Sequence, residues 1–202
     1  MKKLMVIVLA GCVVVMSQGF RAVAAGDDIP DIFDGGQIPL RALAGTYAET
    51  LHGSVALCLE NTPHHALVTC GSPNSIVVPL TLQDVGANTR DAKGNACAIF
   101  TETEANFPVD VSPPAVLIFH VVGKDTNYDP TTGTSDGTFT SYFGGQCHGA
   151  TFDSKGATVA STGTYHYAAS NRGKQVDFVL TALTNPVGAI GDFSLAGTGL
   201  RH

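Results

Sequence analysis

The sequence predicts an all-β fold, an antiparallel up-and-down barrel of roughly eight to ten strands, with a β-sandwich as the alternative. From Leu43 onward, short segments rich in Val, Thr, Ile, Phe and Tyr each end at Gly, Asn, Asp or Pro, which is typical of strands separated by turns. No stretch keeps a helical period over three turns. Turn signals between successive segments favour sequential antiparallel pairing over a parallel sheet.

The N-terminus has the layout of a secretory signal peptide. Lys2 and Lys3 precede an apolar run over residues 4–16, and small residues end the segment at Ala25. The run has 13 residues, fewer than the roughly 17 to 25 of a membrane-spanning helix, and no later segment is long enough, so we expect no membrane span. We predict a signal peptide over 1–25, an extended acidic arm or linker over 26–42 and a single β domain over 43–202.

Such a leader predicts an exported protein, periplasmic or extracellular. Residues 9–12 (LAGC) offer an alternative, because they resemble a bacterial lipobox that would leave Cys12 lipidated at the mature N-terminus. The apolar run continues beyond Cys12, which favours cleavage near Ala25. The remaining chain has eight basic and 17 acidic residues, a net charge of −9. This charge repels nucleic acid and anionic lipid, so neither is an expected partner, and the oligomeric state stays open.

Four cysteines follow the leader: Cys58, Cys70, Cys97 and Cys147. An even number in an exported chain indicates disulfides, for which three pairings exist. We expect Cys58–Cys70 and Cys97–Cys147, because the first pair brackets a plausible hairpin around residues 61–63. Closing even the shorter loop stabilises the fold by about 3 kcal/mol, mostly through the unfolded state.

The strands follow one another along the domain. Residues 26–40 mix aspartates with Pro and Gly and lack periodicity, so the first strand begins after them. Each later interval is a run of β-branched, aromatic or alternating residues that ends at a turn residue. The predicted strands are 43–51, 54–59, 66–70, 76–84, 97–104, 115–122, 137–143, 146–152, 158–168, 175–183 and 189–198.

Two short motifs repeat. The pattern D-x-K-G occurs at 91–94 and at 153–156, and Gly-Thr-Tyr occurs at 45–47 and at 163–165. In D-x-K-G, the Asp accepts a backbone N–H two residues on and the Gly takes a positive φ, which closes a type I turn. The repeats therefore predict tight hairpins between sequential antiparallel strands.

LAGTY at 43–47, FDSKGATVASTGTYHY at 152–167 and a Gly-rich final strand carry a resemblance. In these stretches, the chain resembles a group of uncharacterised secreted bacterial proteins with the layout of small lipocalin-like or allene-oxide-cyclase-like barrels. The resemblance implies a barrel over residues 43–198. It rests on turn motifs, so it transfers no catalytic residue.

Residues 124–137 (KDTNYDPTTGTSDG) contain a calcium-like pattern. Asp125, Asn127 and Asp129 fit the first ligand positions of a calcium loop, and Asp136 falls at its closing position. Pro130 stands where that loop needs glycine, and strands rather than helices flank it. An Asp/Asn-rich hairpin turn is therefore the alternative.

The other motifs are incomplete. G-x-S-x-G at 133–137 lacks the helix that must follow a serine nucleophile. The histidines and cysteines show neither zinc nor haem spacing, and we expect no cofactor.

Polar residues within apolar strands predict an interior site. His120 interrupts VLIFHVVG (116–123), both faces of which are apolar, and Asp177 interrupts QVDFVLTAL (175–183). A polar group in a core strand must be paired or must line a cavity. We therefore consider His120, Asp177 and the nearby His166 as ligand-binding residues of a barrel lumen, with local hydrogen bonding as the alternative.

The sequence thus predicts a secreted, disulfide-stabilised β-barrel that acts as a non-catalytic binding or structural module. The alternative is a carrier of a small apolar ligand, or a barrel enzyme of the isomerase or cyclase type in which His120 is the general acid or base. The absence of a complete catalytic motif favours the non-catalytic function.

Overall fold

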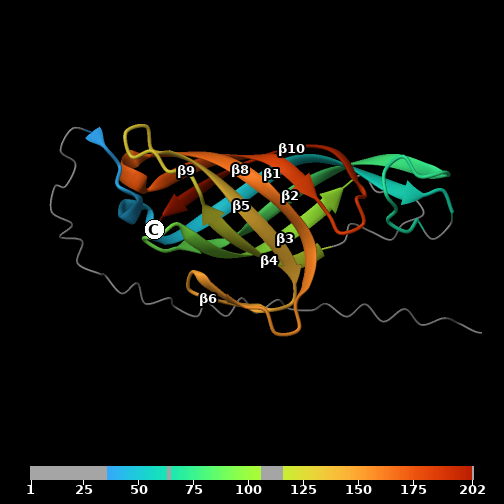
Figure 1. Ribbon diagram of the computed structural model, residues 1–202, viewed down its shortest axis with the longest axis horizontal. Coiled ribbons are helices and arrows are strands. Elements are labelled where there is room, and N and C mark those ends of the chain that lie inside the picture. Colours follow the sequence, from blue (N-terminus) through green and yellow to red (C-terminus); the bar gives the residue numbers. More distant parts are fainter. Residues whose placement is uncertain (1–35, 63–64, 106–115, 202) are drawn as a thin grey trace, which may run out of the picture. The chain divides into compact units, whose positions relative to one another are not determined.

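The computed structural model describes residues 36–62, 65–105 and 116–201. In this part of the chain, eight strands close into one antiparallel barrel in the order β1-β10-β9-β8-β5-β4-β3-β2 (Figure 1). The predicted up-and-down barrel is confirmed, and the sandwich alternative is wrong. The elements are η2 (Leu40–Leu43), β1 (Gly45–Glu60), β2 (Ser75–Arg90), β3 (Asn95–Ala105), β4 (Val116–Asp125), β5 (Thr134–Phe143), β6 (Gln146–His148), β7 (Thr151–Asp153), β8 (Thr158–Ser170), η3 (Asn171–Gly173), β9 (Gln175–Thr184) and β10 (Ile190–Arg201).

Four of the predicted intervals do not each form one separate strand. The intervals 43–51 and 54–59 form the single long strand β1. Gly53 does not end a strand; instead it lets β10 pass close by, because a Cβ there would lie 1.9 Å from the carbonyl oxygen of Ser194. The interval 66–70 contributes only an isolated bridge between Leu67 and Leu59. The interval 146–152 is the short hairpin β6–β7 rather than one strand.

Both D-x-K-G turns have the predicted geometry. Asp91 Oδ1 accepts the backbone N–H of Lys93 at 2.8 Å, and Gly94 has a φ of 76°. Asp153 Oδ1 accepts the N–H of Lys155 at 3.0 Å in the same way. The first turn joins the paired strands β2 and β3. The second joins β7 to β8, which pairs with β5 and β9 instead, so only the first turn makes the expected barrel hairpin.

One end of the barrel is closed by the two short helices, beside which the chain ends (Figure 1). Leu43 and Tyr47 are completely buried there. The Tyr47 hydroxyl lies 2.6 Å from the carbonyl oxygen of Gly173, and Arg201 donates to the carbonyl oxygen of Ala42 at 2.7 Å. Residues 36–42 of the predicted 26–42 arm therefore pack on the barrel through Ile38 and Leu40, whereas residues 26–35 and the predicted leader lie outside the described residues.

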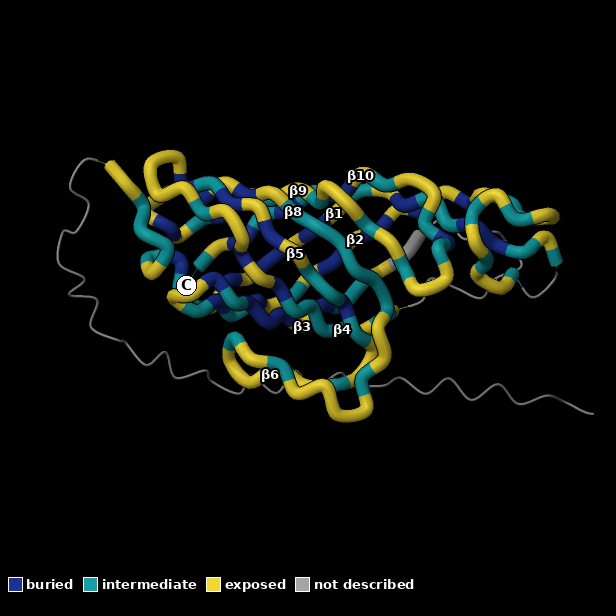
Figure 2. Tube along the Cα trace, viewed as in Figure 1, coloured by how far each residue is buried: buried dark blue, intermediate teal, exposed yellow. Residues whose placement is uncertain are grey.

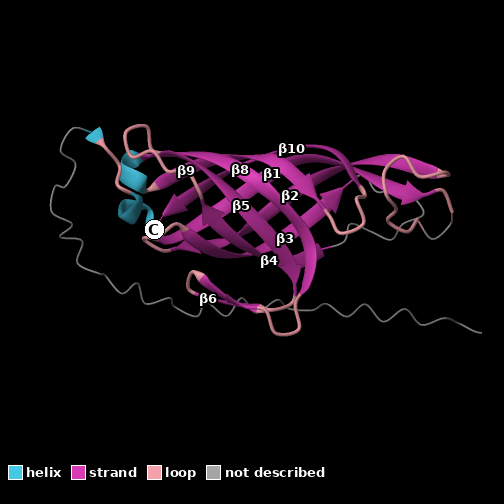
Figure 3. Cartoon of the chain, in the orientation of Figure 1, coloured by secondary structure: helices cyan, strands magenta, loops and turns pink. Residues whose placement is uncertain are grey.

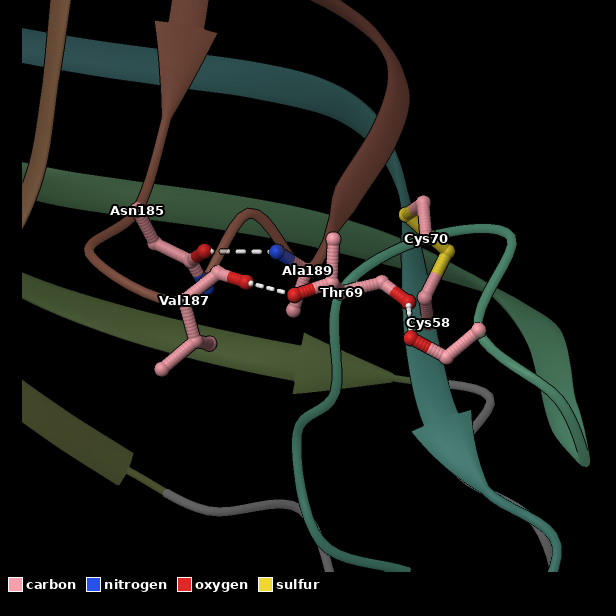
Figure 4. The surroundings of a disulfide bond; sticks show 7 residues. Cys58, Thr69, Cys70, Asn185, Val187 and Ala189 are labelled. Atoms are coloured by element: carbon pink, nitrogen blue, oxygen red, sulfur yellow. Dashed lines mark hydrogen bonds between the residues drawn. A yellow bond between two sulfur atoms is a disulfide. The ribbon is translucent and has the colours of Figure 1, made fainter.

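A disulfide between Cys58 and Cys70 organises the opposite end, where β1 and β2 extend beyond the other strands (Figures 1 and 4). The Thr69 hydroxyl donates to the carbonyl oxygen of Val187 at 2.8 Å. The N–H of Cys58 donates to the carbonyl oxygen of Ala189 at 2.7 Å. The β9–β10 connection is thereby held against the loop that follows β1.

The hairpin β6–β7 lies on the outside of the barrel (Figure 3). Cys147 in β6 forms the second disulfide, with Cys97 in β3. Phe152 in β7 stacks on Tyr142, with ring centroids 4.7 Å apart, and lies 6.0 Å from the ring of His120. Both predicted disulfide pairings are confirmed, and two disulfides agree with an oxidising, exported compartment.

Strand alternation puts one face of each strand inside the barrel (Figure 2). β2 shows this clearly, because its buried positions recur every second residue from Val78 to Asp84 and again at Asn88 and Arg90. A cluster of buried leucines and valines from β1, β2 and β10 fills part of the interior. Among the described residues, no helix has the length and apolar character to cross a membrane.

Candidate functional site

The barrel interior contains a cavity of about 330 Å³, within the range of small-ligand pockets. All eight barrel strands contribute to its wall, represented by Leu51, Leu82, Phe100, Phe119, Phe139, Tyr165, Phe178 and Leu195. Leu67 and Phe143 also line it and are 47% and 45% exposed. The cavity therefore reaches solvent at the end of the barrel where β5 ends.

The cavity is long. On β2, its lining extends from Leu80 to Arg90, ten residues apart, which is about 33 Å along the strand. At the usual tilt of barrel strands, this corresponds to about 25 Å along the barrel axis. Most lining side chains are apolar, and the charged ones lie toward the closed end and along β1, β2 and β3.

A buried ion pair lies near the closed end of the cavity. Arg90 Nη2 donates to both carboxylate oxygens of Asp125 at 2.7 Å, and the two side chains are only 5% and 2% exposed. The hydroxyls of Tyr165 and Tyr167 donate to the same carboxylate at 2.8 and 2.9 Å. The Arg90 guanidinium also lies over the Tyr167 ring, 4.6 Å from its centroid. The Asp125 carboxyl group therefore accepts hydrogen bonds from three side chains.

The pKa values of this group follow from burial and charge. Burial alone lowers the pKa of Arg90, but the adjacent Asp125 charge outweighs it, and the net shift is upward. Burial raises the pKa of Tyr165, and the charge of Asp125 raises it further. Burial also raises the pKa of Tyr167. Both tyrosines therefore remain hydrogen-bond donors at all physiological pH values.

Glu49 is a second buried carboxyl group beside this ion pair. It accepts a hydrogen bond from Asn88 Nδ2 at 2.8 Å, and its side chain packs over Gly199, where a Cβ would lie 3.0 Å from Glu49 Cγ. Burial raises the pKa of Glu49, although Asn88 and Arg90 oppose the shift. Glu49 is thus protonated more readily than an exposed carboxyl group.

Two further carboxyl groups face the cavity on adjacent strands. Asp84 in β2 is directly opposite Glu102 in β3, and both line the cavity between Leu51 and Leu117. Across the barrel, the hydroxyls of Ser141 and Ser161 are 2.6 Å apart. The carboxyl groups that line the cavity therefore all lie on the wall formed by β1, β2 and β3, and the opposite wall contributes only the serine hydroxyls of β5 and β8 near them.

Two buried polar atoms in the cavity have no hydrogen-bond partner among the described residues. They are Arg90 Nε, a donor, and Asn88 Oδ1, an acceptor. Arg90 is 6% exposed and Asn88 is 8% exposed, and both line the cavity. Buried polar groups are nearly always paired, so these two atoms mark a place where a ligand can make hydrogen bonds.

The residues predicted for the lumen lie on the outer surface instead. His166 hydrogen-bonds Asp136 at 2.9 Å, and these side chains are 47% and 59% exposed. Asp177 accepts a hydrogen bond from Thr198 at 2.8 Å, and it shares a shallow outer depression with His166. His120 lies apart from both, beneath Phe152 of the β6–β7 hairpin.

The placement inside the barrel is therefore corrected for His120, His166 and Asp177. In β4, both faces are apolar, and Leu117, Phe119 and Val121 face the cavity while His120 faces outward. Alternation defines two faces of a strand but does not tell which of them points into the barrel. Because the outer face of β4 is also apolar, the sequence offered no reason to place His120 on the outer face rather than the inner one. In the structure, the alternative of local hydrogen bonding holds for His166 and Asp177.

The calcium-like set does not gather around one point. Asp125 points into the barrel toward Arg90, and Asp136 points outward to His166. Asp129 caps its own turn by accepting the N–H of Thr131 at 2.8 Å. The alternative of an Asp-stabilised turn therefore holds for this loop. Among the described residues, no group of three or more His, Cys, Asp or Glu has an arrangement that could hold a metal ion.

Sequence reasoning missed the interior polar residues Glu49, Asp84, Asn88, Arg90 and Glu102. For Asp84, Asn88 and Arg90 a signal was present in β2, where the every-second-residue pattern of LTLQDVGANTR continues from Leu80 through these polar positions. The prediction ended that strand at residue 84, because a charged residue and Gly86 resemble the start of a turn.

The fold and the site define a closed, eight-stranded, up-and-down barrel with a ligand-sized interior. No known family model matches the chain. No curated protein matches it either.

Proposed function

We propose that the protein is a secreted carrier that binds one small, elongated, mainly apolar molecule inside its barrel. The observation that supports this most strongly is the cavity of about 330 Å³, which is apolar near its mouth and has unpartnered polar atoms of Arg90 and Asn88 near its closed end. A structural module would have little use for such a cavity, because protein interiors are normally packed without large voids.

The shape of the cavity indicates how a ligand would lie. The apolar residues toward the mouth, among them Leu57, Leu117, Leu183 and Ile190, would surround the apolar part of the molecule. The polar part would then reach the wall that carries Asn88. Each buried methylene contributes about 0.8 kcal/mol, so affinity should rise about fourfold per added methylene until the cavity is filled.

Export and the barrel layout also support a carrier. The predicted leader and the two disulfides fit a protein that works outside the cytoplasm. The barrel layout also agrees with the resemblance to lipocalin-like barrels, in which the interior is the natural ligand site. A barrel enzyme of the isomerase or cyclase type is the second candidate, favoured by the opposed carboxyl groups of Asp84 and Glu102.

Titration of a fluorescent, polarity-sensitive naphthyl probe tests the carrier function. We expect saturable binding of one probe per protein and displacement by linear alcohols whose affinity increases with chain length. Ala98→Phe fills the lumen and should abolish binding, whereas Ile99→Phe, one residue along β3 on the outer face, should not. Equal binding by both variants would contradict an interior site.

The same samples distinguish a carrier from an enzyme. A carrier releases its ligand unchanged, and mass spectrometry after extraction should recover the original compound. Recovery of an isomer or a cyclised product, lost on Asp84→Asn, would support the enzyme instead.

A further inference from the structure

The closed end of the cavity presents one hydrogen-bond donor and one acceptor that are not paired within the described residues. The donor is Arg90 Nε and the acceptor is Asn88 Oδ1. Both side chains are more than nine-tenths buried, with Arg90 6% and Asn88 8% exposed, and both line the cavity. Because neither atom can turn to bulk solvent, the group that completes them has to lie inside the cavity.

The other bonds of these two side chains hold the two atoms in place. Arg90 Nη2 donates to both oxygens of Asp125, which directs the guanidinium, and its charge is matched there at 2.7 Å. Asn88 Nδ2 donates to Glu49 Oε1 at 2.8 Å, which directs the amide. The unpaired donor and acceptor are therefore fixed features of the wall before any ligand enters.

Strand register puts the two side chains next to each other. Asn88 and Arg90 are two residues apart on the inner face of β2, so their Cα atoms lie about 7 Å apart. A small polar group that lies between neighbouring side chains at this spacing can contact both of them. One ligand group can thus accept from Arg90 Nε and donate to Asn88 Oδ1.

Small residues leave room for that group. On β3, Ala98 is directly opposite Asn88 and Ala96 is directly opposite Arg90. On β4, Gly123 is directly opposite Ala96. All three small residues line the cavity. The wall beside the unpaired donor and acceptor therefore has the lowest possible side-chain bulk, and ligand atoms can occupy the space.

The pairing of one donor with one acceptor selects the chemistry of the ligand group. A carboxylate offers only acceptors, so it would suit Arg90 Nε and place a further acceptor against Asn88 Oδ1. An ammonium offers only donors, so it would suit Asn88 Oδ1 and place a cation beside the guanidinium. A hydroxyl both accepts and donates, and it completes the two atoms without adding a charge.

We propose that the ligand of the lumen is an uncharged amphiphile with a hydroxyl head group, which accepts a hydrogen bond from Arg90 Nε and donates one to Asn88 Oδ1. This proposal rests on the carrier function proposed above. The hydroxyl lies beside Ala96 and Ala98, and the apolar part extends toward the mouth. A long-chain alcohol is the simplest molecule of this class.

Displacement of the neutral naphthyl probe by decanol and methoxynonane tests the proposal. The two compounds have the same number of non-hydrogen atoms, but the ether can only accept a hydrogen bond. Desolvation alone favours the ether, which gives up fewer hydrogen bonds to water. We nevertheless expect decanol to bind about fivefold more tightly, because only decanol satisfies Asn88 Oδ1.

Decanoate and decylamine complete the series at neutral pH, each below its aggregation concentration, and both should bind more weakly than decanol. Equal affinities of decanol and methoxynonane, or preference for either charged compound, would overturn the hydroxyl proposal and leave the carrier function intact. Failure of the probe and of all four compounds to bind would overturn both.

Variants locate the hydroxyl. Asn88→Leu removes the acceptor and should abolish the preference for decanol without weakening the binding of methoxynonane. Ser141→Ala is the matched control, because it removes a different hydroxyl of the cavity wall, which pairs with Ser161 at 2.6 Å, and it should keep the preference. Loss of the preference in Ser141→Ala but not in Asn88→Leu would place the hydroxyl at the serines and overturn the proposal.

A measurement on the wild-type protein keeps the proposal testable if Asn88→Leu does not fold. In proton–nitrogen correlation NMR spectra, saturating decanol should shift the Nε–H signal of Arg90, whereas the signal of Arg41, which is exposed in η2, should stay in place. An Arg90 signal that does not move on binding would overturn the proposed contact.

Discussion

Asp125→Asn tests whether the closed end depends on a buried ion pair. The substitution keeps the shape of the side chain but leaves the Arg90 guanidinium, whose side chain is 5% exposed, without its counter-charge. Removing one partner of a buried ion pair costs about 3 to 5 kcal/mol. For a domain of this size, each kcal/mol lowers the melting temperature by about 2 to 4 °C, so we expect a fall of about 6 to 20 °C.

The assay is urea unfolding followed by circular dichroism, with thermal melting as a second measurement. Asp136→Asn is the matched control, because its pair with His166 is exposed and should leave the melting temperature nearly unchanged. Arg90→Met combined with Asp125→Asn removes the stranded charge and should be more stable than Asp125→Asn alone. The importance of the pair would be refuted if Asp125→Asn lowered the free energy of unfolding by less than about 1 kcal/mol. It would also be refuted if the change in the double variant equalled the sum of the changes in the two single variants.

Three further outcomes are expected. Because burial raises the pKa of Glu49, its contribution to stability is present below its ordinary pKa and is lost as the pH rises through the raised value. Glu49→Gln should therefore be more stable than wild type in urea at pH 8 but not at pH 4. A difference in the free energy of unfolding between variant and wild type that does not change with pH would contradict this. Replacing Cys97 and Cys147 by alanine opens a loop with a sequence separation of 50 and should reduce the free energy of unfolding by about 4 kcal/mol, which chemical denaturation will measure. Gly137→Ala should destabilise the barrel by about 1 to 3 kcal/mol in the same assay, because the new Cβ would lie 2.1 Å from Cζ of Tyr165; an unchanged midpoint would show that this ring is not held in place.

The sequence predicted the barrel because its strongest signals are local. Apolar and β-branched runs mark the strands, and the Asp and Gly of the turn at 91–94 determine its hydrogen bonds without help from distant residues. The disulfide pairing was also accessible, since Cys58 and Cys70 flank one loop. Gly53 was misinterpreted because its role depends on how closely β10 approaches, which is a tertiary property.

The interior site was less predictable, because a barrel closes through contacts between strands far apart in sequence. Arg90 and Asp125 are separated by 35 positions, and their pairing is visible only once β2, β3 and β4 are in register. Which face of a strand points inward is likewise decided by closure. The exposed apolar residues Val116 and Ile118, 64% and 59% exposed, show that an apolar face need not be buried.

Methyl-detected NMR of the protein with a bound linear amphiphile tests the interior site most directly. We expect nuclear Overhauser effects between the ligand chain and the methyl groups of Leu82, Leu117 and Leu183, which line the cavity, and none to Ile118 on the outer face. Contacts to Ile118 with none to the three leucines would place the ligand outside the barrel and contradict a carrier that binds in its lumen.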